Sequence, residues 1–130
     1  MPWVPELPIL QLVSMRATSG FDVDAVKARL AAGSGGYEIV HESPGLEIGV
    51  YVLVAPEPDR QQPHEDDEVY VVLEGNGTLE IEGRRLELRK GHAAFVPAGV
   101  EHRFVGYEQL KLLVVFERRR QIIETKESGS

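Results

Sequence analysis

Two segments of the chain carry residues that could bind one metal ion together. The first runs from Gln62 through His64 to Glu68, and the second reaches His102 after a tight turn at 97–99. Alternate side chains of an extended segment point the same way, so Gln62, His64 and Glu68 can face one interior. The strand that follows the turn brings His102 back toward the same interior. Two imidazoles, one carboxylate and one amide are sufficient to hold a divalent metal.

The donor types of these residues limit the chemistry. Two histidines and one carboxylate on one face of a metal, with open positions opposite, are typical of non-haem Fe(II) oxygenases. The same set suits other divalent transition metals, with Mn, Ni, Zn and Cu the alternatives to Fe. Open positions would let a substrate oxygen or dioxygen bind the metal directly. The chain has no cysteine, which excludes thiolate ligands, cysteine nucleophiles and disulfides.

The elements that must position these residues are short β-strands. Candidate strands, separated by Gly- and Pro-containing breaks, lie at 37–41, 46–54, 68–73, 78–82, 85–89, 93–96, 102–105 and 110–117. This pattern predicts an all-β sandwich or barrel in one domain of 130 residues. One helix is expected after the N-cap Asp22, with Val26 on its apolar face and Gly33 at its end. Residues 1–20 are expected to be extended and residues 124–130 frayed.

Charge and hydropathy limit the partners. A formal net charge of −7 argues against nucleic acid and anionic membranes as partners. No signal peptide and no apolar run of about 20 residues is found, so a cytoplasmic protein is expected. The strand segments 50–54, 69–73 and 112–116 are apolar on both faces, which predicts that a second copy covers the outside in a homodimer. The N-terminal arm is the alternative cover.

The two segments resemble the two conserved motifs of the cupin superfamily over residues 46–117. The first family motif reads G-x5-H-x-H-x3,4-E-x6-G, and the second reads G-x5-P-x-G-x2-H-x3-N. The first is matched in its later part, whereas Gln62 and Pro56 stand where the family has His and Gly. The second is matched except at Gly106, where the family has Asn. The matching residues are His64, Glu68 and Gly75 in the first motif and Gly91, Pro97, Gly99 and His102 in the second.

The resemblance implies a double-stranded β-helix, a small jelly-roll barrel with the metal inside, here preceded by one short N-terminal helix. Cupins are commonly dimeric. His64, Glu68 and His102 occupy ligand positions of the family. Gln62 takes the place of a histidine, so metal ligation and pocket lining are both open for it.

The remaining expectations concern the pocket and the reaction. Tyr70 and Phe104 share strand parity with the ligand positions and are expected, with Tyr51, at the wall of a small-molecule pocket. A place in the core is the alternative for these three residues and the expected place of Phe95. The sequence favours a metal-dependent dioxygenase-type enzyme acting on a small oxygenated or aromatic compound. A non-catalytic binding or sensing protein and a metal-assisted sugar isomerase or epimerase are the alternatives, so enzymatic activity itself is open.

Overall fold

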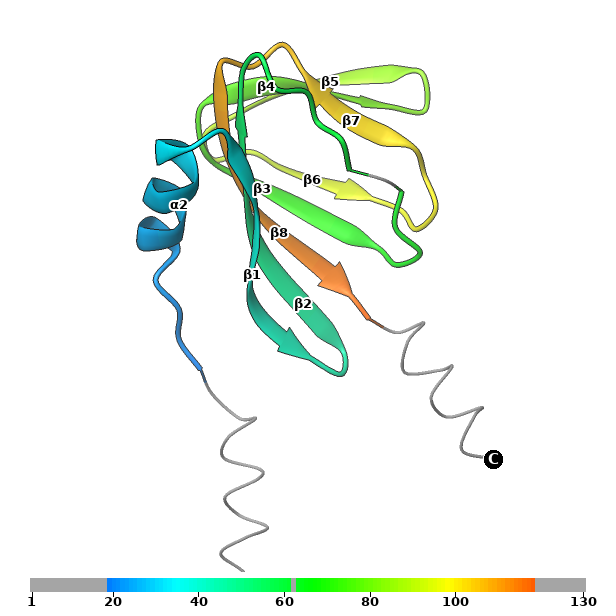
Figure 1. Ribbon diagram of the computed structural model, residues 1–130. Coiled ribbons are helices and arrows are strands. Elements are labelled where there is room, and N and C mark those ends of the chain that lie inside the picture. Colours follow the sequence, from blue (N-terminus) through cyan, green and yellow to red (C-terminus); the bar gives the residue numbers. More distant parts are fainter. Residues whose placement is uncertain (1–18, 62, 119–130) are drawn as a thin grey trace, which may run out of the picture.

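The computed structural model describes residues 19–61 and 63–118, which form one helix and two antiparallel sheets (Figure 1). The helix is α2 (Val23–Ala32), and the strands are β1 (Gly35–Ser43), β2 (Leu46–Val54), β3 (Glu68–Glu74), β4 (Asn76–Ile81), β5 (Arg84–Arg89), β6 (Ala93–Val96), β7 (His102–Val105) and β8 (Gln109–Glu117). The strand candidates from the sequence are all confirmed, with small shifts at their ends. The expected extended arm and frayed tail lie mostly or wholly outside the described residues.

The two sheets face each other across one apolar core. Strands β1-β2-β8-β3-β6 form the larger sheet and β5-β4-β7 the smaller one. Alternation decides which side chains enter the core: along β8, Leu110, Leu112, Val114 and Phe116 are buried. They meet β4 side chains such as Leu79, which is fully buried. This arrangement is a double-stranded β-helix, and the predicted all-β class is confirmed.

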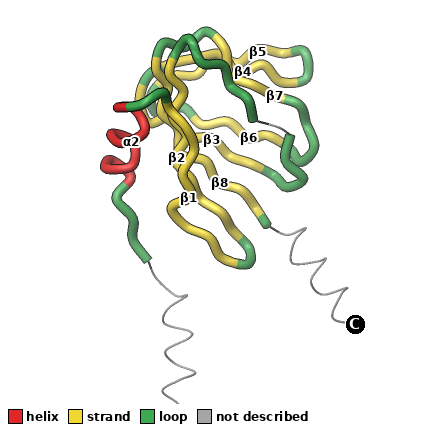
Figure 2. Tube along the Cα trace, in the orientation of Figure 1, coloured by secondary structure: helices red, strands yellow, loops and turns green. Residues whose placement is uncertain are grey.

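Helix α2 covers one part of the outer face of the larger sheet (Figure 2). Asp22 caps it, because its side chain accepts a hydrogen bond from the Ala25 amide at 3.0 Å, and Gly33 ends it. Val26 packs against Val50 and Val52, the outward side chains of β2. The predicted helix is therefore confirmed with its cap and its apolar face. No helix among the described residues has the length and apolarity needed to cross a membrane.

The rest of that outer face remains apolar beyond the helix. Val69 lies between Val115 of β8 and Phe95 of β6 in the sheet register. Phe95 is 57% exposed, so its expected place in the core is wrong. The physical reason is strand parity: Ala94 and Val96 on either side point inward, which turns the Phe95 ring outward.

A charge cluster ties α2 to the larger sheet. The Glu74 carboxylate at the end of β3 accepts hydrogen bonds from Lys27 of α2 and from Lys111 of β8. Both ammonium groups are largely shielded, with 13% and 15% of their side chains exposed, whereas 44% of the Glu74 side chain is exposed. The hydrogen bonds from Lys27 and Lys111 lower the pKa of Glu74 below its ordinary value.

We expect Glu74→Gln to destabilise the fold near neutral pH by about 0.5–1 kcal/mol, the range of a partly exposed ion pair. A lowered folded-state pKa means that the stabilisation is present above the unfolded-state value, about 4.5. It is lost as pH falls through the lower folded-state value, so the two proteins should converge in acid. Urea unfolding at several pH values measures this. Glu101→Gln, at an exposed site, is the control, and an equal pH dependence in both variants would refute the assignment.

Candidate functional site

The site is a buried polar group between the two sheets. Glu68 begins β3 on the larger sheet and His102 begins β7 on the smaller one. Glu68 Oε1 lies 3.1 Å from His102 Nε2, and each side chain is 1% exposed. The Tyr70 hydroxyl lies 2.9 Å from the same nitrogen. His102 Nδ1 lies 2.8 Å from the Val100 carbonyl, which can only accept, so Nδ1 carries a proton.

The electrostatics of the site are dominated by the buried carboxylate. Neither oxygen of Glu68 has a hydrogen-bond partner among the described residues, so its contact with His102 is an electrostatic one. Burial lowers the pKa of His102, but Glu68 and the Val100 carbonyl more than offset this and raise it above its ordinary value. Burial, followed by the charge of Glu68, raises the pKa of the Tyr70 hydroxyl far above its ordinary range.

Of the other two predicted ligands, only His64 lies among the described residues. His64 lies in the segment before β3, with its ring centroid 4.1 Å from that of Phe116. Phe116 is the register partner of Glu68, so His64 is beside the site. Within residues 19–61 and 63–118 no three His, Asp or Glu side chains are gathered closely enough to hold a metal. Gln62 lies outside the described residues.

Glu68 and His102 nevertheless fit a divalent metal. Two ligands each about 2.1 Å from one ion and at right angles to each other are separated by about 3 Å. The separation of 3.1 Å between Glu68 Oε1 and His102 Nε2 is of that size. A buried carboxylate that makes no aligned hydrogen bond to the described residues also favours a nearby cation, because a buried charge is costly unless a positive partner compensates it. One nitrogen and one oxygen donor suit the first-row transition metals.

A cavity of about 920 Å³ reaches His102 from outside. The β4–β5 turn, the segment that precedes β3 and the turn before β7 enclose it, and its wall includes Asp59, Gln61, Arg84, Val100 and His102. The expected wall residues lie elsewhere. Tyr70 and Phe104 are 0% and 1% exposed and fill the core, and Tyr51 packs against that core.

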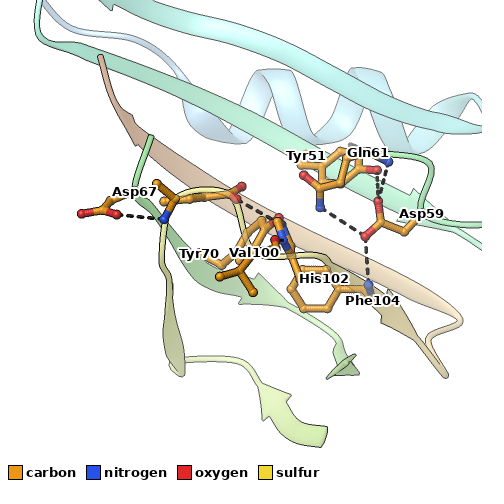
Figure 3. A network of polar contacts seen from close by, with 10 residues as sticks. Tyr51, Asp59, Gln61, Asp67, Tyr70, Val100, His102 and Phe104 are labelled. Atoms are coloured by element: carbon orange, nitrogen blue, oxygen red, sulfur yellow. Dashed lines mark hydrogen bonds and ion pairs between the residues drawn. The ribbon is translucent and has the colours of Figure 1, made fainter. Parts of the chain in front are cut away.

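A hydrogen-bonded hub at Asp59 holds this wall together (Figure 3). Asp59 Oδ1 accepts hydrogen bonds from the Tyr51 hydroxyl at 2.6 Å and from the backbone amide of Gln61 at 3.2 Å. Oδ2 accepts from the Gln61 side chain at 3.2 Å and from the Phe104 backbone at 2.9 Å. The hub therefore fastens the segment between β2 and β3 to the free edge of β7, two residues beyond His102.

Sequence reasoning missed Asp59 and Gln61. The Pro-containing segment 56–59 predicts only a break between two strands, and strand parity predicts the direction of the residues that follow it. In the structure residues 63–67 are not in a strand, so that parity does not hold for His64. Asp often accepts a hydrogen bond from the backbone amide two residues later, as Asp59 does from Gln61, and this preference is the local signal that could have indicated it. The hydrogen bond to Phe104 spans 45 residues and leaves no such signal.

The fold and the buried His–Glu pair in a small barrel define the class of protein. A family model described as "Cupin domain" matches residues 50–116, more than half of the chain, and the chain belongs to that family. The resemblance of the two motifs is thereby confirmed.

Individual proteins and solved structures are also similar to this chain. An uncharacterized protein of Streptomyces coelicolor is 36% identical over 97 residues, which cover 74% of this chain and 92% of that protein. Acireductone dioxygenase of Leishmania major is 34% identical over 95 residues, covering 67% of this chain but 28% of the enzyme. A solved structure from Thermus thermophilus has a TM-score of 0.66 and 27% identity, covering 77% of this chain and 97% of that one.

We expect Asp59→Asn to lower the free energy of unfolding by about 1–3 kcal/mol. Each carboxylate oxygen of Asp59 accepts two hydrogen bonds. The side-chain NH₂ of an asparagine would replace one of these oxygens in either orientation, and two donors would then face another donor. Urea denaturation measures the change.

Asp67→Asn is the matched control. Asp67 Oδ1 accepts one hydrogen bond, from the Ala98 amide at 3.0 Å, which the oxygen of an asparagine can still accept. Equal stabilities of the two variants would contradict the role of Asp59 as a hub.

Proposed function

We propose that this chain is a metal-binding cupin of the dioxygenase type, acting on a small oxygenated or aromatic compound. Glu68 and His102 would hold a divalent transition metal, with His64 a further ligand by its motif position. A bound metal would supply open positions and redox chemistry for substrate and dioxygen. The cavity of about 920 Å³ beside His102 would admit the substrate, with Gln61 and Arg84 as polar groups on its wall.

The observation that carries this proposal is the Glu68 carboxylate, which is buried to 1% exposure, has no hydrogen-bond partner in the described part of the chain and lies 3.1 Å from His102 Nε2. A carboxylate in that position is destabilising unless a cation stays near it. The similarity to acireductone dioxygenase supports a redox role, although the match spans 28% of that enzyme. The proposal for the reaction and the substrate of this chain therefore rests on the residues of the site.

A non-catalytic binding protein is the second candidate. The packed interior favours it: Tyr70 and Phe104 fill the barrel, and the cavity wall includes His102 without Glu68. A dioxygenase should consume oxygen when the metal-loaded protein meets its substrate, and a chelator should abolish this. A binding protein would take up ligand equally with and without chelator.

We also propose that the chain forms a homodimer through the outer face of the larger sheet. The proposal is supported by the apolar row Val115–Val69–Phe95, in which Phe95 is 57% exposed and no member belongs to the cluster that packs under α2. Exposed apolar area of this kind typically marks an interface.

We expect tag-free protein, purified without chelator, to carry stoichiometric metal. Glu68→Gln and His102→Ala should lose it while remaining folded, because each removes one of the paired donors, and His64→Ala should reduce it. Elemental analysis measures the metal, and circular dichroism checks the fold. His92→Ala, at an exposed histidine bonded to the Arg89 amide, is the control. Unchanged metal in the Glu68 and His102 variants would refute the site.

For the dimer, light scattering during size exclusion should give twice the chain mass of 14.4 kDa. Phe95→Asp should yield monomers, because it puts a charge in the centre of the apolar row. Ser34→Asp adds the same charge in an exposed turn and should remain dimeric. A monomeric wild type, or a Phe95→Asp dimer of wild-type strength, would refute this interface.

A further inference from the structure

Tyr70 is the third polar group of the buried site. Its hydroxyl lies 2.9 Å from His102 Nε2, and the residue is fully buried. Edge-to-face packing fixes its ring, with the centroid 4.9 Å from that of Phe104 and 5.8 Å from that of His102. Because Tyr70 follows Glu68 by two positions in β3, both side chains point into the barrel.

We propose that Tyr70 is itself a metal ligand, which joins Glu68 and His102 in one coordination sphere. This inference rests on the proposed metal site and adds an oxygen donor that neither motif contains.

The distances carry this assignment. Ligands at right angles around one first-row ion lie about 3 Å apart. Two contacts of His102 Nε2 have that length, 3.1 Å to Glu68 Oε1 and 2.9 Å to the Tyr70 hydroxyl. Both oxygens therefore lie at the separation from Nε2 that two ligands of one ion have. His64 has no comparable contact with the group, because its ring lies against Phe116.

The charge balance supports the same set. A carboxylate and a phenolate together neutralise a divalent ion, so the loaded site would carry no net charge in a dry interior. A bound cation stabilises the phenolate, and the phenol proton is released to solvent on binding. With Glu68 and neutral histidines alone, one positive charge would remain buried.

The test is a titration with Cu(II) and with Mn(II) of the wild type and Tyr70→Phe. A copper–phenolate bond gives a charge-transfer absorption band, which we expect in the wild type and not in the variant. The variant should bind Mn(II) at least about tenfold more weakly by calorimetry, the loss typical of a ligand or its close support. Phenylalanine keeps the ring packing, and thermal unfolding checks this.

Tyr51→Phe is the matched control. It removes a partly buried phenol hydroxyl that contacts Asp59 and not His102, and it should keep both the band and the affinity. A band that persists in Tyr70→Phe, or Mn(II) binding that is unchanged or tighter, would overturn the inference and leave the proposed metal site standing. Wild-type protein that takes up neither ion would refute the metal site and the inference with it.

Discussion

The carboxylate of Glu68 lies inside an apolar barrel, where neither oxygen makes a well-aligned hydrogen bond to the described residues and Oε1 is in ionic contact with His102 Nε2. An unpaired charge in such a place costs several kcal/mol, so a positive partner is required. His102 Nε2 lies 3.1 Å from Glu68 Oε1, and Glu68 together with the Val100 carbonyl raises the pKa of the imidazole. In the proposed loaded site the metal would replace the imidazole proton as the positive partner of the carboxylate. Strand register and the hydrogen bonds of Asp59 then determine the surroundings of Glu68 and His102.

Strand register is what brings the two side chains together. Glu68 is set opposite Phe116 on one side and Val96 on the other, so β3 cannot shift without moving an apolar set out of the core. His102 is set opposite Ile81 in the smaller sheet. Each partner thus belongs to a different sheet, and the packing of the two sheets fixes the 3.1 Å between them.

The same registers explain what the sequence could predict. The strands, the capped helix and the inward direction of Glu68, Tyr70 and Phe104 follow from alternation and turn residues, which are local. The outward direction of Phe95 follows from the same alternation, once Ala94 and Val96 are known to face inward. The placement of His64 could not be predicted, because residues 63–67 have no strand geometry and parity has no meaning there.

The position of the segment before β3 depends on contacts between residues far apart in the sequence. Its course is fixed by Asp59, whose carboxylate joins Tyr51 of β2, Gln61 and the Phe104 amide of β7. Edge strands expose backbone donors that must find acceptors, and this carboxylate supplies one for β7. Because the Phe104 amide lies two residues beyond His102, the contact that covers the edge also fixes the wall beside the imidazole. The shape of the cavity therefore depends on a loop residue at a position that the first metal motif leaves unspecified.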